Sequence, residues 1–268
     1  KHFLADAAHQ LKTPLAGLRT QAELAGREIE AGQHDPAALR ESLRQIARSS
    51  QSAAHMVNQL LAMARAEHEE PAVRQGAVNL ALLAREAVRD FVPRALERQI
   101  DLGFEGPPGS EGAATPPGPR ILCSALLLRE LVRNLVDNAL LYTPRGGAVT
   151  VRVIDDPFGQ VAVLQVEDSG PGISPGEREQ VFRPFYRSLG TGVDGSGLGL
   201  AIVREIATRH GAEITLEDAD TRRRDLPAAA GESGPGALFT VRFAAAPASA
   251  LHQPATFRDG HQQAQAQA

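Results

Sequence analysis

Three groups of residues, far apart in the chain, have types and spacings that suit a phosphoryl-transfer reaction. His9 lies in the segment Ala8-His9-Gln10-Leu11-Lys12-Thr13-Pro14-Leu15, on the side of an expected helix that points away from its apolar seam. Imidazole is both neutral and nucleophilic near pH 7, so it can accept a phosphoryl group. Two asparagines one helical turn apart and two glycine-rich turns follow much later. A nucleophile in one segment and a nucleotide site in another predict phosphoryl transfer onto His9.

The later residues supply the groups that a nucleotide site needs. Asn134 and Asn138 lie on one face of a helix, where their amides can hold a hydrated Mg²⁺ and orient a triphosphate. Asp168 ends a strand before two glycines and can accept a hydrogen bond from the exocyclic amine of a base. The run Gly195-Ser196-Gly197-Leu198-Gly199-Leu200 opens a helix, whose bare N–H groups and positive dipole end favour phosphate. The order of these elements matches neither the Rossmann fingerprint nor the P-loop.

Each of these residues also has a purely structural interpretation. An exposed helical histidine commonly has no chemical role, and Asn134 and Asn138 can simply cap or solvate their helix. Pro14 lacks a backbone donor and clashes with the carbonyl four residues earlier, so it predicts a bend beside His9. The triplet Arg222-Arg223-Arg224 favours a solvated surface over a binding patch.

Length and composition allow two modest domains and exclude some classes of protein. The 268 residues are 43% hydrophobic but only 4% aromatic, so the cores must rest on aliphatic side chains. The formal charge of −4 gives no electrostatic footprint for nucleic acid. The single cysteine, Cys123, is expected in the core; it allows no intrachain disulfide and fits a reducing compartment. No apolar run approaches the roughly 18 residues of a membrane span. The chain begins inside a helical pattern without a start methionine, so we expect the C-terminal part of a longer protein.

The first 68 residues predict a helical hairpin. Two runs of apolar or small residues at three- and four-residue steps form coiled-coil seams. The first seam comprises Leu4, Leu11, Leu15, Leu18, Ala22, Ala25 and Ile29, and the second comprises Leu39, Leu43, Ile46, Ser50, Ala53, Val57, Leu60 and Ala64. Between them, Asp35 suits an N-cap and Pro36 the first helical position. One hairpin buries such narrow stripes poorly, so two copies are predicted to form a dimeric four-helix bundle.

The rest of the chain predicts a mixed domain. Helices are expected over 80–96, 124–142, 181–185 and 198–210, and strands over 100–104, 149–154, 161–167, 212–217 and 238–243. This order favours an α/β sandwich with helices on one face of a mainly antiparallel sheet. The remaining segments are interpreted as a linker at 67–76, a loop at 106–119, a mobile insert at 218–236 and a disordered tail beyond Ala246.

Taken in this order, the segments resemble the sequence boxes of the histidine kinases of two-component signalling. The matching boxes are Ala8–Leu15, Asn134–Ala139, Asp168–Gly172, Val181–Arg187 and Gly195–Leu200. The resemblance covers residues 1–245. Residues 5–18 are also similar to the sensors that regulate tricarboxylate transport.

The resemblance implies an α+β multidomain protein. It places a dimerisation and histidine-phosphotransfer domain at 1–68, a linker at 69–77, a catalytic ATP-binding domain at 78–246 and a tail at 247–268. The ATP-binding domain would belong to the superfamily of gyrase, chaperone, histidine kinase and mismatch-repair ATPases. The implied partners are a response regulator and a second copy of the chain, without nucleic acid. The full-length protein would be anchored in the inner membrane through an absent N-terminal part, with this portion in the cytoplasm.

The resemblance also implies roles for single residues. His9 would attack the γ-phosphate of ATP, and the phosphoryl group would then pass to an aspartate of the regulator. Asp168 would read the adenine amine, and Asn138 would coordinate Mg²⁺ with Asn134 on the same face. Arg187 would meet the γ-phosphate. The site and its lid at 188–194 would be shaped by Gly170, Gly172, Gly195, Gly197, Leu198 and Gly199, with Phe182 and Phe185 anchoring the start of the lid.

Three positions bear on how well the reaction would run. Gln10 stands where the family usually has an acidic residue, and an amide cannot act as a base. Leu141 stands where the family often has a basic residue for phosphate contact. Thr13 matches the position that orients water when such a kinase acts as a phosphatase.

Two alternatives stay open at this stage. One is an ATPase of the same superfamily that acts on DNA or client proteins, although such enzymes usually have a water-activating glutamate at the position of Asn134. The other is a catalytically weak scaffold that dimerises and docks a regulator. The glycine boxes argue against a scaffold, whereas Gln10 and Leu141 argue for one.

Overall fold

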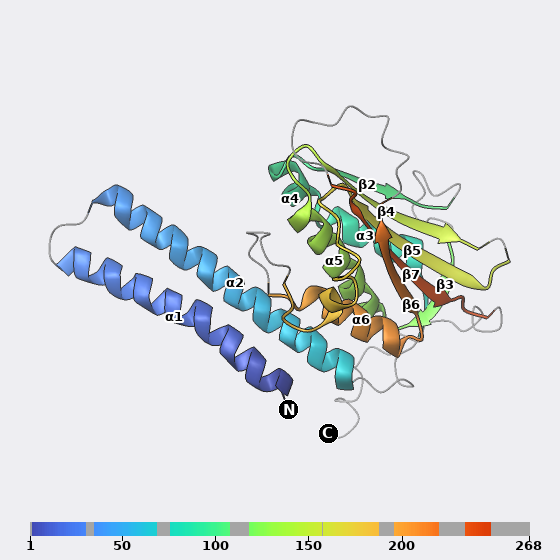
Figure 1. Cartoon of the computed structure of the whole chain (residues 1–268), viewed down its shortest axis with the longest axis horizontal. Helices are drawn as coiled ribbons and strands as arrows, with labels where there is room; N and C mark the ends of the chain where they lie inside the picture. Colours follow the sequence, from blue (N-terminus) through green and yellow to red (C-terminus); the bar gives the residue numbers. More distant parts are fainter. Residues whose placement is uncertain are drawn as a thin grey trace, which may run out of the picture.

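A helical hairpin and a mixed α/β domain make up the computed structural model (Figure 1). The structure describes residues 2–30, 35–68, 76–107, 118–156, 158–187, 196–219 and 234–247. Within these ranges, the side chains of residues 2–14, 28, 51, 52, 55, 58, 59 and 62–68 lie outside the description. No described helix is long and apolar enough to cross a membrane.

The hairpin pairs helix α1 (His2–Glu30) with helix α2 (Pro36–His68), and α1 continues through Pro14. The predicted start of α2 is confirmed, because the Ala37 N–H donates to Oδ1 of Asp35 at 3.0 Å. The two helices pack along their length (Figure 1), and the small seam residues Ala25 and Ala53 are buried. The seams therefore lie at least partly between the two helices, as predicted.

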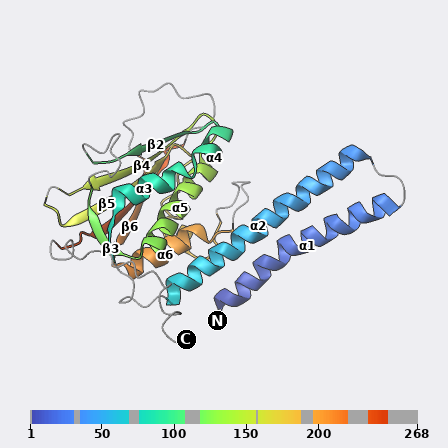
Figure 2. The same ribbon diagram turned by 180° about the vertical axis from the view of Figure 1, so that it is seen from behind.

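The mixed domain contains a five-stranded sheet in the order β2-β4-β5-β7-β6. Its strands are β2 (Asp101–Glu105), β4 (Ala148–Asp155), β5 (Val161–Asp168), β6 (Glu213–Asp218) and β7 (Ala237–Ala244). Only the β2–β4 pair is parallel. Helices α3 (Leu80–Arg89), α4 (Val92–Glu97), α5 (Ala125–Tyr142) and α6 (Gly199–Arg209) cover one face of the sheet (Figures 1 and 2). The predicted α/β sandwich with a mainly antiparallel sheet is therefore confirmed.

The core lies between the sheet and helices α5 and α6. Alternate residues of β5 are buried, as expected for a strand with one face toward helices. The ring of Phe182 meets Phe239 of β7 edge to face, with centroids 6.3 Å apart, so the segment after β5 is tied into this core. On the opposite face of the sheet, Arg152 forms ion pairs with Glu105 and Glu167 across three strands. That face therefore carries charged side chains, unlike the face that the helices cover.

The hairpin meets the mixed domain through α2, which packs against α6 in both views (Figures 1 and 2). Leu60 of α2 lies half-buried against the core of the mixed domain. Seam residues on the outer side of the hairpin remain exposed, and they include Leu15, Ile29, Leu43 and Val57.

Several local predictions were wrong. The expected helix at 80–96 is split into α3 and α4, because Pro93 cannot donate the hydrogen bond that would continue α3. The expected helix at 181–185 is a single 3₁₀ turn, Gln180–Phe182. Two short strands were missed, β1 (Gly76–Asn79) and β3 (Arg120–Cys123), which pair antiparallel with each other. Gly76, expected in a linker, begins β1.

Other predicted segments lie wholly or partly outside the described residues. The linker is described only at its two ends, and the tail only as far as residue 247. Of the insert at 218–236, the stretch 220–233 is outside the description. Gly234, Pro235 and Gly236 were assigned to this mobile insert, yet they pack closely against the turn after β5. That part of the prediction was wrong.

Candidate functional site

Asp168 ends β5 as a buried carboxylate. Its Oδ1 accepts hydrogen bonds from the Gly170 N–H at 2.9 Å and from the Ala237 N–H at 3.3 Å. Burial raises the pKa of Asp168 to about 6, although the two backbone N–H groups act in the opposite direction. The carboxyl group is thus mostly ionised at pH 7 despite its burial.

The second oxygen of Asp168 is the chemically available one. Within the described part of the chain, Oδ2 accepts no hydrogen bond. No described side-chain polar atom is both sealed from solvent and without a partner, so Oδ2 keeps some contact with solvent although Asp168 as a whole is buried. An anionic oxygen in this state can accept a hydrogen bond from a ligand amine.

The turn after Asp168 is closed by glycines that allow close backbone approach. A Cβ on Gly170 would lie 3.0 Å from the carbonyl oxygen of Tyr142, so this turn touches the C-terminal end of α5. Gly172 has φ +75°, and a Cβ there would lie 2.7 Å from Pro235. The glycines therefore let the backbone of this turn pass close to the end of α5 and to Pro235.

Helix α5 carries the two predicted asparagines in different states. Leu131, Leu135 and Ala139 face the core and are fully buried. Asn134 is buried, and its Nδ2 donates to the Glu130 carbonyl at 2.8 Å. Asn138 is half-buried, and among the described residues its side-chain amide has no hydrogen-bond partner. Asn138 is therefore the one of the two whose amide oxygen is available to a ligand.

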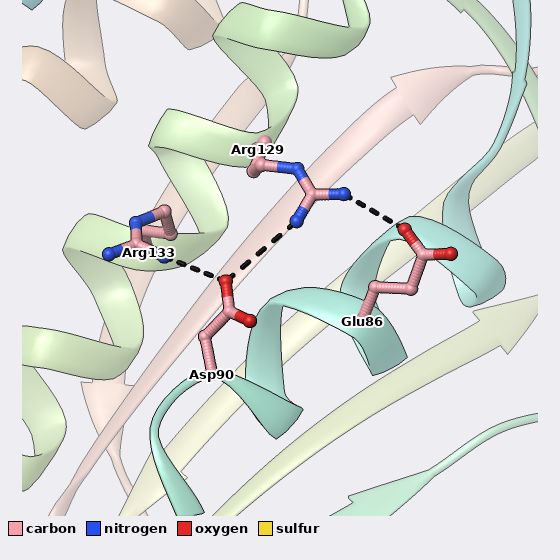
Figure 3. Close-up of polar contacts among 4 residues, drawn as sticks. All are labelled: Glu86, Asp90, Arg129 and Arg133. Carbon is pink, nitrogen blue, oxygen red and sulfur yellow. Dashed lines mark hydrogen bonds and ion pairs between the residues drawn. The ribbon is translucent and has the colours of Figure 1, made fainter. Parts of the chain in front are cut away.

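A ladder of polar contacts fixes the position of α5 along α3 and α4, and Figure 3 shows the contacts of Glu86 and Asp90 with Arg129 and Arg133. Sequence reasoning missed this ladder. Every rung joins residues 43 positions apart: Glu86 with Arg129, Asp90 with Arg133, Arg94 with Asp137, and Arg98 with the Leu141 carbonyl. The acidic partner lies in α3 or at its C-cap in the first two rungs and in α5 in the third. Sliding α5 by one rung would place Asp90 beside Asp137 in one direction and Arg94 beside Arg133 in the other. The charges therefore favour a single register.

The second glycine turn leads into α6. Gly197 has φ +71°, and a Cβ there would lie 2.7 Å from the backbone of Phe185. The Phe185 N–H donates to the Gly197 carbonyl at 2.9 Å, so the two ends of the intervening segment are joined. Leu198 is fully buried before Gly199 starts α6. These contacts place the N-terminus of α6 next to the segment that Phe182 anchors in the core.

The N-terminus of α5 has no side-chain cap. Ser124 is the N-cap residue, but its side chain makes no capping hydrogen bond. Its backbone N–H donates instead to Nε2 of His210 at 3.3 Å, and Nδ1 of His210 lies 2.7 Å from the Ile206 carbonyl. His210 therefore links the start of α5 to the end of α6. Cys123, one residue earlier, is a buried core residue, and burial raises the pKa of its thiol to about 12.

The remaining predicted site residues are only partly placed. His9, Gln10 and Thr13 lie on α1, and their side chains are outside the description. Gly195 and the expected lid at 188–194 are also outside it. Arg187 is exposed at the end of the described segment that precedes the lid.

Two family models match separate parts of the chain. Residues 1–69 match the His Kinase A (phospho-acceptor) domain, and residues 123–247 match the histidine kinase-, DNA gyrase B- and HSP90-like ATPase. The sensor protein kinase PmrB of Pseudomonas aeruginosa is 37% identical over 217 residues, which are 81% of this chain and 42% of PmrB. The sensor protein QseC of Salmonella typhi is 34% identical over 219 residues, which are 82% of this chain and 45% of QseC. The chain thus spans less than half the length of these curated relatives.

Solved structures show the same arrangement of elements. The mycobacterial sensor histidine kinase MprB superposes with a TM-score of 0.50 at 29% identity, over 65% of this chain and 99% of that one. The histidine kinase ThkA in complex with response regulator protein TrrA superposes with a TM-score of 0.63, over 92% of this chain and 62% of that one. Because the identity to ThkA is 20%, that likeness shows the fold alone.

Proposed function

This chain belongs to the sensor histidine kinases of bacterial two-component systems, and we propose that it transfers the γ-phosphoryl group of ATP to His9. The observation that carries the proposal is the pairing, in one chain, of a phospho-acceptor hairpin with an ATPase-type domain that has an open anionic oxygen on Asp168. Residues 1–68 would be the dimerisation and phosphotransfer domain, and residues 78–246 the catalytic domain.

Asp168 and Asn138 would bind the two ends of ATP. Oδ2 of Asp168 suits the adenine amine, because it is ionised at pH 7 and has no partner among the described residues. The amide oxygen of Asn138 is the kind of ligand that Mg²⁺ prefers, and its lack of a partner in the described chain fits that role. When bound, Mg²⁺ would neutralise phosphate charge. Asn134, already bonded to its own helix, would support this face of α5.

The phosphate end of the site would be formed around the start of α6. Gly197, Leu198 and Gly199 precede or open this helix, where unpaired N–H groups attract phosphate oxygens. Gly195 and the lid at 188–194 would complete this end, and Arg187 would reach the γ-phosphate. Gly170 and Gly172 would shape the base end, consistent with their close contacts.

The reaction would begin with a neutral His9 imidazole. A ring nitrogen attacks the γ-phosphorus of ATP, the bond to the bridging oxygen breaks, and ADP leaves. The proton on the other ring nitrogen is then lost to solvent, because Gln10 cannot accept it. The transition state of such a transfer is loose, so positioning and charge neutralisation dominate the rate. The phosphoryl group would pass to an aspartate of a response regulator. Thr13 would orient the water that hydrolyses the aspartyl phosphate of the regulator when the chain acts as a phosphatase.

A second copy of the chain would complete the hairpin. Leu15, Ile29, Leu43 and Val57 all belong to the predicted seams, yet they are between 42% and 55% exposed in the single chain. A dimeric four-helix bundle would bury them. Full burial of an aliphatic side chain contributes roughly 1.5–3 kcal/mol, and about half of that would remain to be gained for each of these half-covered residues. We further propose that the full-length protein is anchored in the inner membrane, with this portion in the cytoplasm, as its similarity to sensor proteins implies.

Incubation with γ-labelled ATP and Mg²⁺ tests the reaction. The chain should acquire label that is stable in base and lost in acid, as expected for phosphohistidine, and His9→Gln should abolish it. His34→Gln is the matched control, because it also removes an imidazole from the hairpin. Label that persists in the His9→Gln chain would sink the assignment, and release of phosphate without labelling would indicate an ATPase of the superfamily instead.

A further inference from the structure

The segment that enters β7, Gly234–Ala237, lies against the turn that carries Asp168, although the residues in contact are at least 63 positions apart in sequence. We call it the β7 entry segment. A Cβ added to Gly236 would lie 2.2 Å from the Asp168 carbonyl oxygen, and one added to Gly234 would lie 2.2 Å from the Pro171 carbonyl oxygen. The Gly236 N–H also donates to the Gly170 carbonyl at 3.1 Å. These are among the closest backbone approaches at the described glycines.

This close approach brings one donor to the Asp168 side chain. The Ala237 N–H reaches Oδ1 at 3.3 Å, beside the Gly170 N–H at 2.9 Å. Two donors on one oxygen fix the rotation of the carboxylate. The other oxygen, Oδ2, is therefore held on the side that retains contact with solvent. Ala237 is itself buried, so water does not readily replace its N–H.

We propose that the β7 entry segment is a base-specificity element, which holds Oδ2 of Asp168 toward the 6-position of the purine. The inference rests on the proposed role of Asp168 in ATP binding. An ionised oxygen accepts a hydrogen bond from the 6-amino group of adenine. It repels the 6-oxo group of guanine, which is also an acceptor. Ala237 and Gly236 are positioning residues here, since they act through Asp168.

Glycine at position 236 is required on two physical grounds. Its φ of +70° is unfavourable for residues with a Cβ, and the space for a Cβ is filled by the Asp168 backbone. Gly159 has a similar φ of +66°, but a Cβ there would meet nothing within 4 Å. Gly159→Ala thus reproduces the backbone strain without the displacement, and it is the matched control for Gly236→Ala.

The test measures dissociation constants for ATP and GTP with the full chain and three variants. Ala237→Pro removes the N–H donor at the first residue of a strand, where proline is tolerated. Gly236→Ala pushes the segment away from Asp168. Both should weaken ATP binding by about tenfold, the loss of one good hydrogen bond to a charged group, while GTP binding stays within about twofold. Gly159→Ala should leave both constants unchanged.

Asp168→Asn separates failure of this inference from failure of the proposed function. If Asp168→Asn leaves the ATP preference intact, Asp168 does not read the base and the proposed function is wrong in that respect. If Asp168→Asn abolishes the preference but Ala237→Pro and Gly236→Ala retain it, the β7 entry segment is not a specificity element and the inference is overturned.

A measurement on the unaltered chain covers the case in which the variants do not fold. The amide proton resonances of Gly170 and Ala237 should both titrate with one midpoint near pH 6, because both N–H groups donate to the same carboxylate. Added ATP should lower that midpoint. A Gly170 resonance that titrates while the Ala237 resonance stays constant would overturn the inference.

Discussion

Replacing Asp168 with Asn should make the ATP-free protein more stable at neutral pH while it weakens ATP binding. The carboxylate is buried, and its pKa is raised from the ordinary 3.8 to about 6. The folded state therefore binds the proton more tightly than the unfolded state does. The ionised form is the disfavoured one in the fold, and the asparagine side chain of the variant would resemble the neutral acid in shape and hydrogen bonding.

The size of this effect follows from the shift in pKa. At 1.36 kcal/mol per unit, a rise from 3.8 to about 6 corresponds to about 3 kcal/mol. Because the folded pKa is the higher one, the contribution of Asp168 to the unfolding free energy is greatest below pH 4. It declines as the pH rises through 6, and it is about 3 kcal/mol lower above that pH. The Asp168→Asn variant lacks this decline.

Denaturant titrations of both chains at several pH values between 4 and 8 would measure the difference. The two unfolding free energies should be similar near pH 4 and diverge toward pH 7, where the variant should be more stable by up to about 3 kcal/mol. Isothermal titration with ATP should show the opposite order at pH 7. The amide introduced by Asp168→Asn presents a donor where the adenine amine needs an acceptor, so we expect a loss of about tenfold or more.

Gly159→Ala serves as a reference for changes in stability that do not involve the site. A variant that is markedly less stable at pH 7 and retains wild-type ATP affinity would refute the reasoning, since Asp168 would then be a structural residue. A gap between the two chains that does not change with pH would equally show that the carboxylate titrates as it does in the unfolded chain.

Three further outcomes follow from the proposed function and the fold. Gln10→Glu should raise the single-turnover rate of His9 labelling, by at most the roughly 10²–10⁴-fold range of general-base effects, and an equal or lower rate would show that no base is needed there. The full chain should scatter light as a dimer, and Leu43→Asp should shift it to monomer whereas the similarly exposed Leu126→Asp, in the ATP-binding domain, should not. Asp90→Arg places a third guanidinium beside Arg129 and Arg133. Because salt screens the resulting repulsion, the melting temperature of the variant should fall by a few degrees at low salt and recover at high salt. A melting temperature that does not depend on salt would contradict the role of the ladder.

The parts of the site that form from local sequence could be predicted. Asn134 and Asn138 share a helix whose apolar residues set its buried face, so their relative placement follows from the 3.6-residue period alone. The glycines at 170, 172 and 197 likewise mark turns, and their positive φ values or close contacts bear this out. Each of these inferences needed no knowledge of a distant part of the chain.

The parts that depend on distant pairing could not be predicted. Ala237 lies 69 positions after Asp168, and it reaches that carboxylate only because β5 and β7 are neighbours in the sheet. The strands β1 and β3 have four residues each, and apolar and polar residues do not alternate regularly in their sequences. Only their mutual pairing therefore identifies them as strands. The ladder between α3–α4 and α5 could have been suspected, since charges recur at four-residue steps in both segments. The parallel alignment that matches them is a property of the packed fold.

The buried carboxylate explains why this site should couple stability to nucleotide binding. In the ATP-free domain, two backbone N–H groups at Oδ1 offset only part of the effect of burial on the pKa of Asp168, so this pKa stays raised. A ligand amine at Oδ2 would add a third donor to the ionised form and lower that pKa, so binding near pH 6 should release a proton. ATP affinity must then fall as the pH drops through 6, in the same range where the free domain becomes more stable. Asp168 thus destabilises the ATP-free domain and also makes adenine the preferred base. An amide at this position would stabilise the ATP-free domain, but it would remove the preference for adenine.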